Sequence, residues 1–244
     1  MGFNKGSFKK GQNSWNGKMK ASLNKNLDNS KVLQDFWTIE NVNYRNKICK
    51  VNLLKTLLDN RNRKNQDSWA EFSKQAKENN GFYLGDMPLY HSIFTKLYEL
   101  KDKPKSNKIR DFLKEQFLKR GLMTLTRINY QPNGCLDKIV HNYKMPDEYL
   151  IEGNFSGLDE DVEYFKNKRN YKSLLDSNNP EEINFVYNWI TGKNARLFRV
   201  NSKPEQEDKR IAWFGVKFNW IYLNCCRSPF IALSGLGVRV VEEK

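Results

Sequence analysis

The first half of the chain carries apolar residues at helical spacing. One stripe runs through residues 47–59 and predicts a helix there. It consists of Ile48, Val51, Leu54, Leu57 and Leu58. A second helix is expected to begin near Asp67, whose side chain can cap it, and to end at about residue 79. Two short helices in a basic region would allow a helix-turn-helix, but plain packing of amphipathic helices gives the same pattern.

Capping signals predict two further helices between residues 87 and 120. Asp86 can accept hydrogen bonds from the first backbone amides of a helix, and Pro88 fits its first turn. The sequence Lys-Pro-Lys-Ser at residues 103–106 interrupts the apolar pattern, and Gly121 ends the second helix. Residues 82–84 are expected to form a short strand ahead of this helix pair.

From residue 122 onward the pattern indicates strands. Residues 122–128 alternate and are rich in β-forming residues, and residues 139–143 can return as a second strand. Asn179 and Pro180 then open one more helix, which Gly192 ends. Helices followed by a β-rich half predict an α+β fold.

The C-terminal segment mixes aromatic and small polar residues without a clean period. Residues 195–200 and 235–241 read as strands, and another strand begins at residues 210–213. Between them, residues 214–230 hold five aromatic side chains, and no Asp or Glu occurs from Lys209 to Val241. Such a mixture is typical of binding loops, because aromatic rings supply contact area at low conformational cost. A buried β-region would have the same composition.

Two short motifs frame this mixed stretch. Residues 196–201 read Arg-Leu-Phe-Arg-Val-Asn, and residues 235–241 read Gly-Leu-Gly-Val-Arg-Val-Val. With the stretch between them, they resemble the variable proteins of diversity-generating retroelements, whose members typically end in a Gly-x-Arg-Val-Val strand just after the diversified positions. The resemblance implies a C-type lectin fold, in the branch shared with formylglycine-generating enzymes, with paired helices early and a variable binding face late.

The resemblance also implies which positions vary. In that family an error-prone reverse transcriptase misreads template adenines, so that Asn codons of the AAY type become any NNY codon. Because NNY never encodes Trp or Lys, Trp213, Lys217 and Trp220 are expected to stay fixed. The expected framework residues are Trp213, Trp220, Gly237 and Arg239. The expected ligand-binding positions are Phe214, Val216, Phe218, Asn219, Ile221, Tyr222, Asn224, Cys225, Cys226, Arg227, Ser228 and Phe230.

No pattern in the sequence points to catalysis. The four cysteines and two histidines are Cys49, Cys135, Cys225, Cys226, His91 and His141, and their spacing fits no standard metal site. The paired cysteines and metal ligands of the enzyme branch are missing, and so are a P-loop and a Ser/His/Asp pattern. We therefore expect a non-catalytic protein without metal or cofactor, which binds an unidentified macromolecular ligand at its variable face.

The charge is distributed unevenly and opens an alternative. The chain has a formal net charge of +14; residues 1–127 hold 26 Lys and Arg against 12 Asp and Glu, whereas residues 128–244 hold 16 of each. A basic block suggests an anionic partner, either a nucleic acid or an acidic surface, for residues 1–127. The alternative function is therefore nucleic-acid binding through this half. The aromatic residues that could stack on bases are Trp15, Phe36, Trp37 and Trp69.

These patterns divide the chain into three expected parts. Residues 1–45 would be a basic flexible arm with a docking segment, and residues 46–79 a short helical region. Residues 80–244 would form the lectin-like domain, with its variable region at about 213–234. No apolar run approaches the ~20 residues of a membrane span. The N-terminus lacks the apolar stretch of a signal peptide, so a cytoplasmic location is expected.

Overall fold

The computed structural model describes residues 35–162 and 168–242, which form one compact unit. The helices are η1 Asp59–Arg61, α2 Gln66–Glu78, α3 Met87–Glu99, α4 Pro104–Lys119, α5 Lys168–Leu175 and α6 Pro180–Thr191. The strands are β1 Phe36–Tyr44, β2 Lys47–Leu57, β3 Tyr83–Leu84, β4 Leu122–Tyr130, β5 Asp137–His141, β6 Tyr149–Gly153, β7 Glu160–Asp161, β8 Asn194–Phe198, β9 Asp208–Lys217, β10 Trp220–Arg227 and β11 Ser234–Glu242. The α+β class is confirmed. Of the expected arm and docking segment, residues 1–45, residues 1–34 lie outside the described residues. The rest is not an arm, because Phe36–Tyr44 form strand β1, which pairs with β2 in the sheet.

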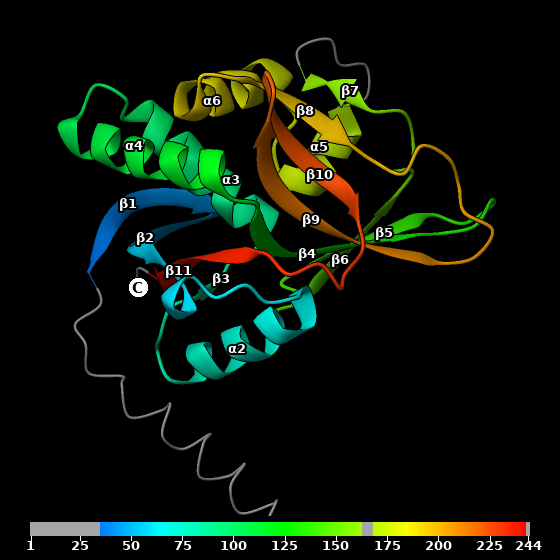
Figure 1. The fold of residues 1–244 in the computed structure, drawn as a ribbon, viewed down its shortest axis with the longest axis horizontal. Coiled ribbons are helices and arrows are strands. Elements are labelled where there is room, and N and C mark those ends of the chain that lie inside the picture. The colour runs from blue at the N-terminus through cyan, green and yellow to red at the C-terminus, as the bar shows by residue number, and fades with distance from the viewer. Residues whose placement is uncertain (1–34, 163–167, 243–244) are drawn as a thin grey trace, which may run out of the picture. The chain divides into compact units, whose positions relative to one another are not determined.

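All strands belong to one mixed sheet with the order β1-β2-β11-β4-β9-β10-β8-β7, to which β3, β5 and β6 add at the sides (Figure 1). Strand β11 pairs antiparallel with β2 and parallel with β4, so the last described strand lies inside the sheet. Helices α3, α4 and α6 lie together on one side of the strands, and α2 lies on the other side. The sheet thus has helical cover on both faces.

The predicted helix over residues 47–59 is wrong, because this segment is strand β2. Cys49, Val51 and Leu53 are buried on one face of the strand, and Asn52 and Leu54 are buried on the other. A strand covered on both faces has a nearly continuous apolar run, which periodicity cannot distinguish from a buried helix. Because residues 47–57 form a strand, the segment cannot be the first helix of a helix-turn-helix. The strand joins residues 46–79 to the rest of the domain, since β2 pairs with β11.

The caps of three other helices largely follow the sequence. Asp86 caps α3 by accepting from the Leu89 amide at 2.8 Å, and Asn179 caps α6 by accepting from the Glu182 amide at 3.3 Å. Helix α2 also forms as predicted, but its cap is Asn65, not Asp67. The Asp86 carboxylate is fully buried, and burial raises its pKa to about 6.

A buried histidine joins two helices to the sheet. His141 Nδ1 lies 2.9 Å from Thr126 Oγ1, and His141 Nε2 lies 2.9 Å from the Ser173 carbonyl oxygen. Because Thr126 Oγ1 already accepts from the Met87 amide, its proton can go to Nδ1, which leaves Nε2 as the imidazole N–H donor. Burial lowers the pKa of His141 to about 4, so the ring is neutral near pH 7.

Candidate ligand-binding site

The segment without a clean period is the hairpin of β9 and β10. Leu223 pairs with Phe214, and Asn224 pairs with Trp213 across the two strands. Side chains alternate between the faces of the sheet, so Phe214 and Leu223 point inward while Trp213 and Asn224 point outward. The alternation is hidden in the sequence because the outward positions are also aromatic or apolar.

The inward positions of the hairpin belong to the core. Phe214 is 1% exposed, and Ile221 and Cys225 are fully buried. The Phe214 ring lies 5.8 Å from the rings of Phe94 and Phe117. The prediction that Phe214, Ile221 and Cys225 contact a ligand is therefore wrong, since a ligand cannot reach them in the folded protein.

The outward face of the hairpin continues onto strand β8, which the sequence analysis did not include in the site. The Phe198 and Tyr222 rings meet edge to face at a centroid distance of 4.4 Å. The Arg196 guanidinium lies 5.5 Å from the rings of both Phe198 and Trp220, and it pairs with Asp161 at 2.9 Å. The parallel pairing of β8 with β10, which brings Phe198 beside Asn224, is a long-range contact that sequence spacing does not reveal.

Trp213 lies over two glycines on this outward face. A Cβ added to Gly215 would lie 2.3 Å from Trp213 Cζ3, and one added to Gly121 would lie 2.8 Å from the same atom. The indole therefore packs against bare backbone at adjacent points of β9 and the start of β4. Trp213 thus fills the space above these two glycines.

The outward face is hollowed into a groove of about 560 Å³ between the hairpin and the end of α4. We call it the β9–β10 groove. The predicted ligand-binding residues that line it are Val216, Phe218, Tyr222, Asn224, Cys226 and Arg227. Its lining also includes Lys119, Arg120 and Lys217 but no Asp or Glu, so the groove is basic and aromatic.

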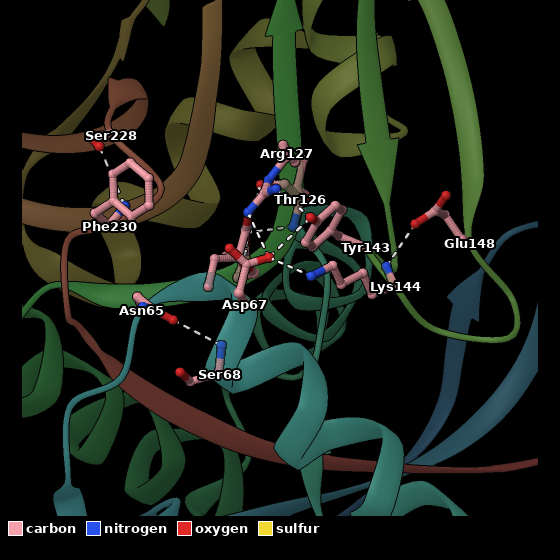
Figure 2. Close-up of polar contacts among 12 residues, drawn as sticks. Asn65, Asp67, Ser68, Thr126, Arg127, Tyr143, Lys144, Glu148, Ser228 and Phe230 are labelled. Carbon is pink, nitrogen blue, oxygen red and sulfur yellow. Dashed lines mark hydrogen bonds and ion pairs between the residues drawn. The ribbon is translucent and has the colours of Figure 1, made fainter.

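Three predicted contact residues lie outside the groove. Asn219 is exposed at the tip of the hairpin, next to Phe218. Ser228 and Phe230 follow β10, and Phe230 is 81% exposed, with its amide donating to Ser228 Oγ at 3.4 Å (Figure 2). These three positions are open to a partner without being part of the hollow.

Two more of the expected framework residues, Gly237 and Arg239, lie on strand β11. A Cβ on Gly237 would lie 2.4 Å from Leu54 Cδ1, so β11 and β2 approach closely there. The Arg239 guanidinium donates to the Asn80 carbonyl at 2.9 Å and lies 4.9 Å from the Phe82 ring. The Gly-x-Arg-Val-Val motif thus serves the packing of the sheet in this structure.

A polar cluster that the sequence analysis missed joins α2 to β4 and the segment after β5 (Figure 2). Nearly buried Arg127 donates from Nε to Gln66 Oε1 at 2.8 Å and from Nη1 to the Tyr143 hydroxyl. Asp67 Oδ1 accepts from Tyr143 at 3.0 Å and pairs with Lys144 at 2.8 Å. Burial acts to raise the pKa of Asp67, but the Lys144 hydrogen bond and the Arg127 charge outweigh it and lower the pKa.

The polar groups of this cluster bond to one another, and the cluster holds α2 against the sheet. Each of its charged groups has a partner of opposite charge within the cluster. The one signal in the sequence is Arg127, a charged residue on the same strand face as Met123 and Leu125. Such an inward charge needs a buried partner, but the sequence does not indicate which one.

The residues proposed for base stacking are less accessible than the alternative function requires. Trp69 is fully buried, and its Nε1 donates to the Leu233 carbonyl at 2.9 Å. Phe36 and Trp37 are half-buried in β1, and Trp15 lies outside the described residues. The prediction that Trp69 stacks on bases is therefore wrong.

Within residues 35–162 and 168–242, no helix combines the length and apolar character needed to cross a membrane. In the same part of the chain, no three His, Cys, Asp or Glu side chains gather as a metal site would require. Comparison of the chain with models of protein families, with curated proteins and with solved structures yields no match.

Proposed function

We propose that this protein is a non-catalytic ligand-binding protein that uses the β9–β10 groove and the adjoining loop after β10 as its contact surface. The observation that carries the proposal is the division of one hairpin. Its inward side chains fill the aromatic core, whereas its outward side chains gather in a hollow without acidic residues. A rigid strand pair can change its outward side chains at little cost to folding, because they contribute little to the core.

The order of elements supports a C-type lectin fold of the kind found in variable proteins of diversity-generating retroelements. The resemblance implies paired helices early and a variable face just before the last strand. Helices α3 and α4 precede the β-rich half, and the β9–β10 hairpin and the loop after it directly precede β11. Strand β11 carries the Gly-x-Arg-Val-Val motif and pairs with β2.

The backbone at Phe218 supports the assignment of variable positions. Phe218 has a φ of 53° at the tip of the hairpin and is 74% exposed. A bulky residue rarely adopts this left-handed conformation, which Asn adopts several times more often. If Phe218 replaced an Asn of the template, the Phe would occupy a backbone conformation that suits Asn better.

The set of positions that we propose to vary is smaller than the set whose codons can arise from AAY. We restrict it to positions outside the buried core, which excludes Phe214, Ile221 and Cys225. Val216 pairs with Ile221 and so also points inward, but it is only half-buried and lines the groove. The proposed contact positions are Val216, Phe218, Asn219, Tyr222, Asn224, Cys226, Arg227, Ser228 and Phe230. Adjacent Cys225 and Cys226 then need no redox role, and burial raises the pKa of the Cys225 thiol well above its usual value.

Sequencing of the gene neighbourhood in many isolates tests this proposal. We expect a near-repeat of the segment encoding residues 213–241, with adenines at the codons of the outward positions. Variation among isolates should concentrate at those positions and spare Phe214, Ile221 and Trp213. Absence of the near-repeat, or equal variation at inward and outward positions, would refute the proposal.

A further inference from the structure

The β9–β10 groove carries cations from three elements. Lys119 and Arg120 end α4, Lys217 ends β9, and Arg227 ends β10. Lys119 pairs with Glu115 on its own helix, but both side chains are more than half exposed, so the pair is weak and screened by water. Among the described residues, none of the other three cations makes an ion pair.

The exposed ends of Lys217 and Arg227 set the chemistry of this lining. Arg120 Nε and Trp213 Nε1 also lack a hydrogen-bond partner, but both atoms are buried, so the charged side-chain ends are what a ligand meets. A ligand that suits this lining therefore brings negative charge, as a carboxylate does.

The aromatic rings of the groove favour a side chain over a stack of bases. The Tyr222 ring meets Phe198 edge to face, and Lys217 Nζ lies 5.0 Å from the centroid of the Phe218 ring. Arg196 lies over Phe198. Because base stacking needs open ring faces in succession, these occupied rings suit one apolar side chain inserted among them.

We propose that the β9–β10 groove binds an acidic polypeptide segment, with carboxylates on the four cations and one aromatic or apolar side chain against Trp213 and Tyr222. This inference rests on the proposed function and names its ligand class. Three of the cations, Lys119, Arg120 and Lys217, lie outside the proposed variable positions. The preference for acidic partners therefore belongs to the scaffold, and the variable side chains choose among such partners.

Fluorescence anisotropy with labelled probes tests the proposal on the full chain. The probes are a fluorescein-labelled peptide with Glu residues on both sides of a central Trp, the same peptide with Lys for Glu, and a labelled oligothymidine. We expect the Glu peptide to bind and to weaken as NaCl is added, because the contacts are charged. The Lys peptide should not bind measurably.

Charge reversal locates the binding. Lys217→Glu combined with Arg227→Glu should weaken binding of the Glu peptide about tenfold or more. Lys47→Glu combined with Lys74→Glu changes the net charge equally at exposed positions outside the groove, and it should have little effect. Thermal unfolding of both double variants checks that each is folded.

Three results would overturn the inference: equal binding of the Glu and Lys peptides, equal weakening by both double variants, or tighter binding of oligothymidine, which would indicate a nucleic-acid ligand. The two proposals fail separately. A near-repeat in the gene neighbourhood without binding of the Glu peptide leaves the proposed function intact and removes the acidic ligand. Groove-dependent peptide binding without a near-repeat keeps the acidic ligand and removes the claim that the contact positions are diversified.

Discussion

Truncation of Phe214 is the sharpest test of which face of the hairpin is buried. Phe214 is 1% exposed, and its ring centroid lies 5.8–6.2 Å from those of Tyr90, Phe94, Phe117 and Tyr187. Removal of a buried Phe side chain costs about 3–5 kcal/mol, from lost transfer free energy and the cavity left behind. Four rigid rings from three helices cannot collapse readily into that cavity. We therefore expect the stability loss for Phe214→Ala to lie near the upper end of this range.

The matched comparison is Phe218→Ala, four residues further along the same strand and turn. Phe218 is 74% exposed, so its truncation should change the free energy of unfolding by less than about 0.5 kcal/mol. Urea unfolding followed by circular dichroism measures both variants at pH 7. Because a domain has only about 5–15 kcal/mol of stability, Phe214→Leu provides a milder variant with an intermediate loss. Losses below about 1 kcal/mol for both Phe214 variants would show that the ring is not in the core.

Three further predictions concern backbone and pH. Gly215→Ala should cost about 1–3 kcal/mol because its Cβ would strike an indole at 2.3 Å, whereas Gly153→Ala, with nothing within 4 Å, should be nearly neutral; equal unfolding midpoints in urea would contradict this. Phe218→Asn should raise the free energy of unfolding by about 1 kcal/mol by relieving a φ of 53°, and a loss in differential scanning calorimetry would count against it. Burial lowers the pKa of His141 to about 4 in the folded state. The stability that the neutral ring contributes is therefore fully present above pH 6.5 and is lost as pH falls toward 4. Stability measured from pH 7 to 4 should therefore fall by about 3 kcal/mol less in His141→Gln than in the original chain, and parallel pH profiles would refute the assignment.

Local chemistry made several elements predictable from the sequence. Asp86 and Asn179 act as helix caps through their own side chains, and Pro88 and Pro180 occupy first turns. Each signal acts within a few residues, so tertiary structure did not need to be known. The strand at residues 122–128 was equally clear, because its β-forming residues are dense and form β4.

The errors arise where both faces of a strand are covered. Strand β2 has inward and outward apolar residues and was predicted as a helix, and the β9–β10 hairpin showed no period for the same reason. The inward role of Phe214 depends on helices far away in the chain. Phe198 joins the candidate site only through the pairing of β8 with β10, and Arg127 meets Asp67 only when α2 folds onto the sheet. Such contacts leave no local signal.

The position of β11 has a consequence for how the chain is made. Strands β2 and β4 both pair with residues 234–242, which the ribosome adds after all the other described strands. Until then β2 has an unpaired backbone edge beside apolar side chains, a condition that favours pairing with other chains. Strand β4 lacks a partner only at Leu122 and Met123, because β5 and β9 already pair with the rest of it. Sheet closure is thus a late, long-range step, and a nascent chain stalled upstream of β11 exposes mainly the edge of β2.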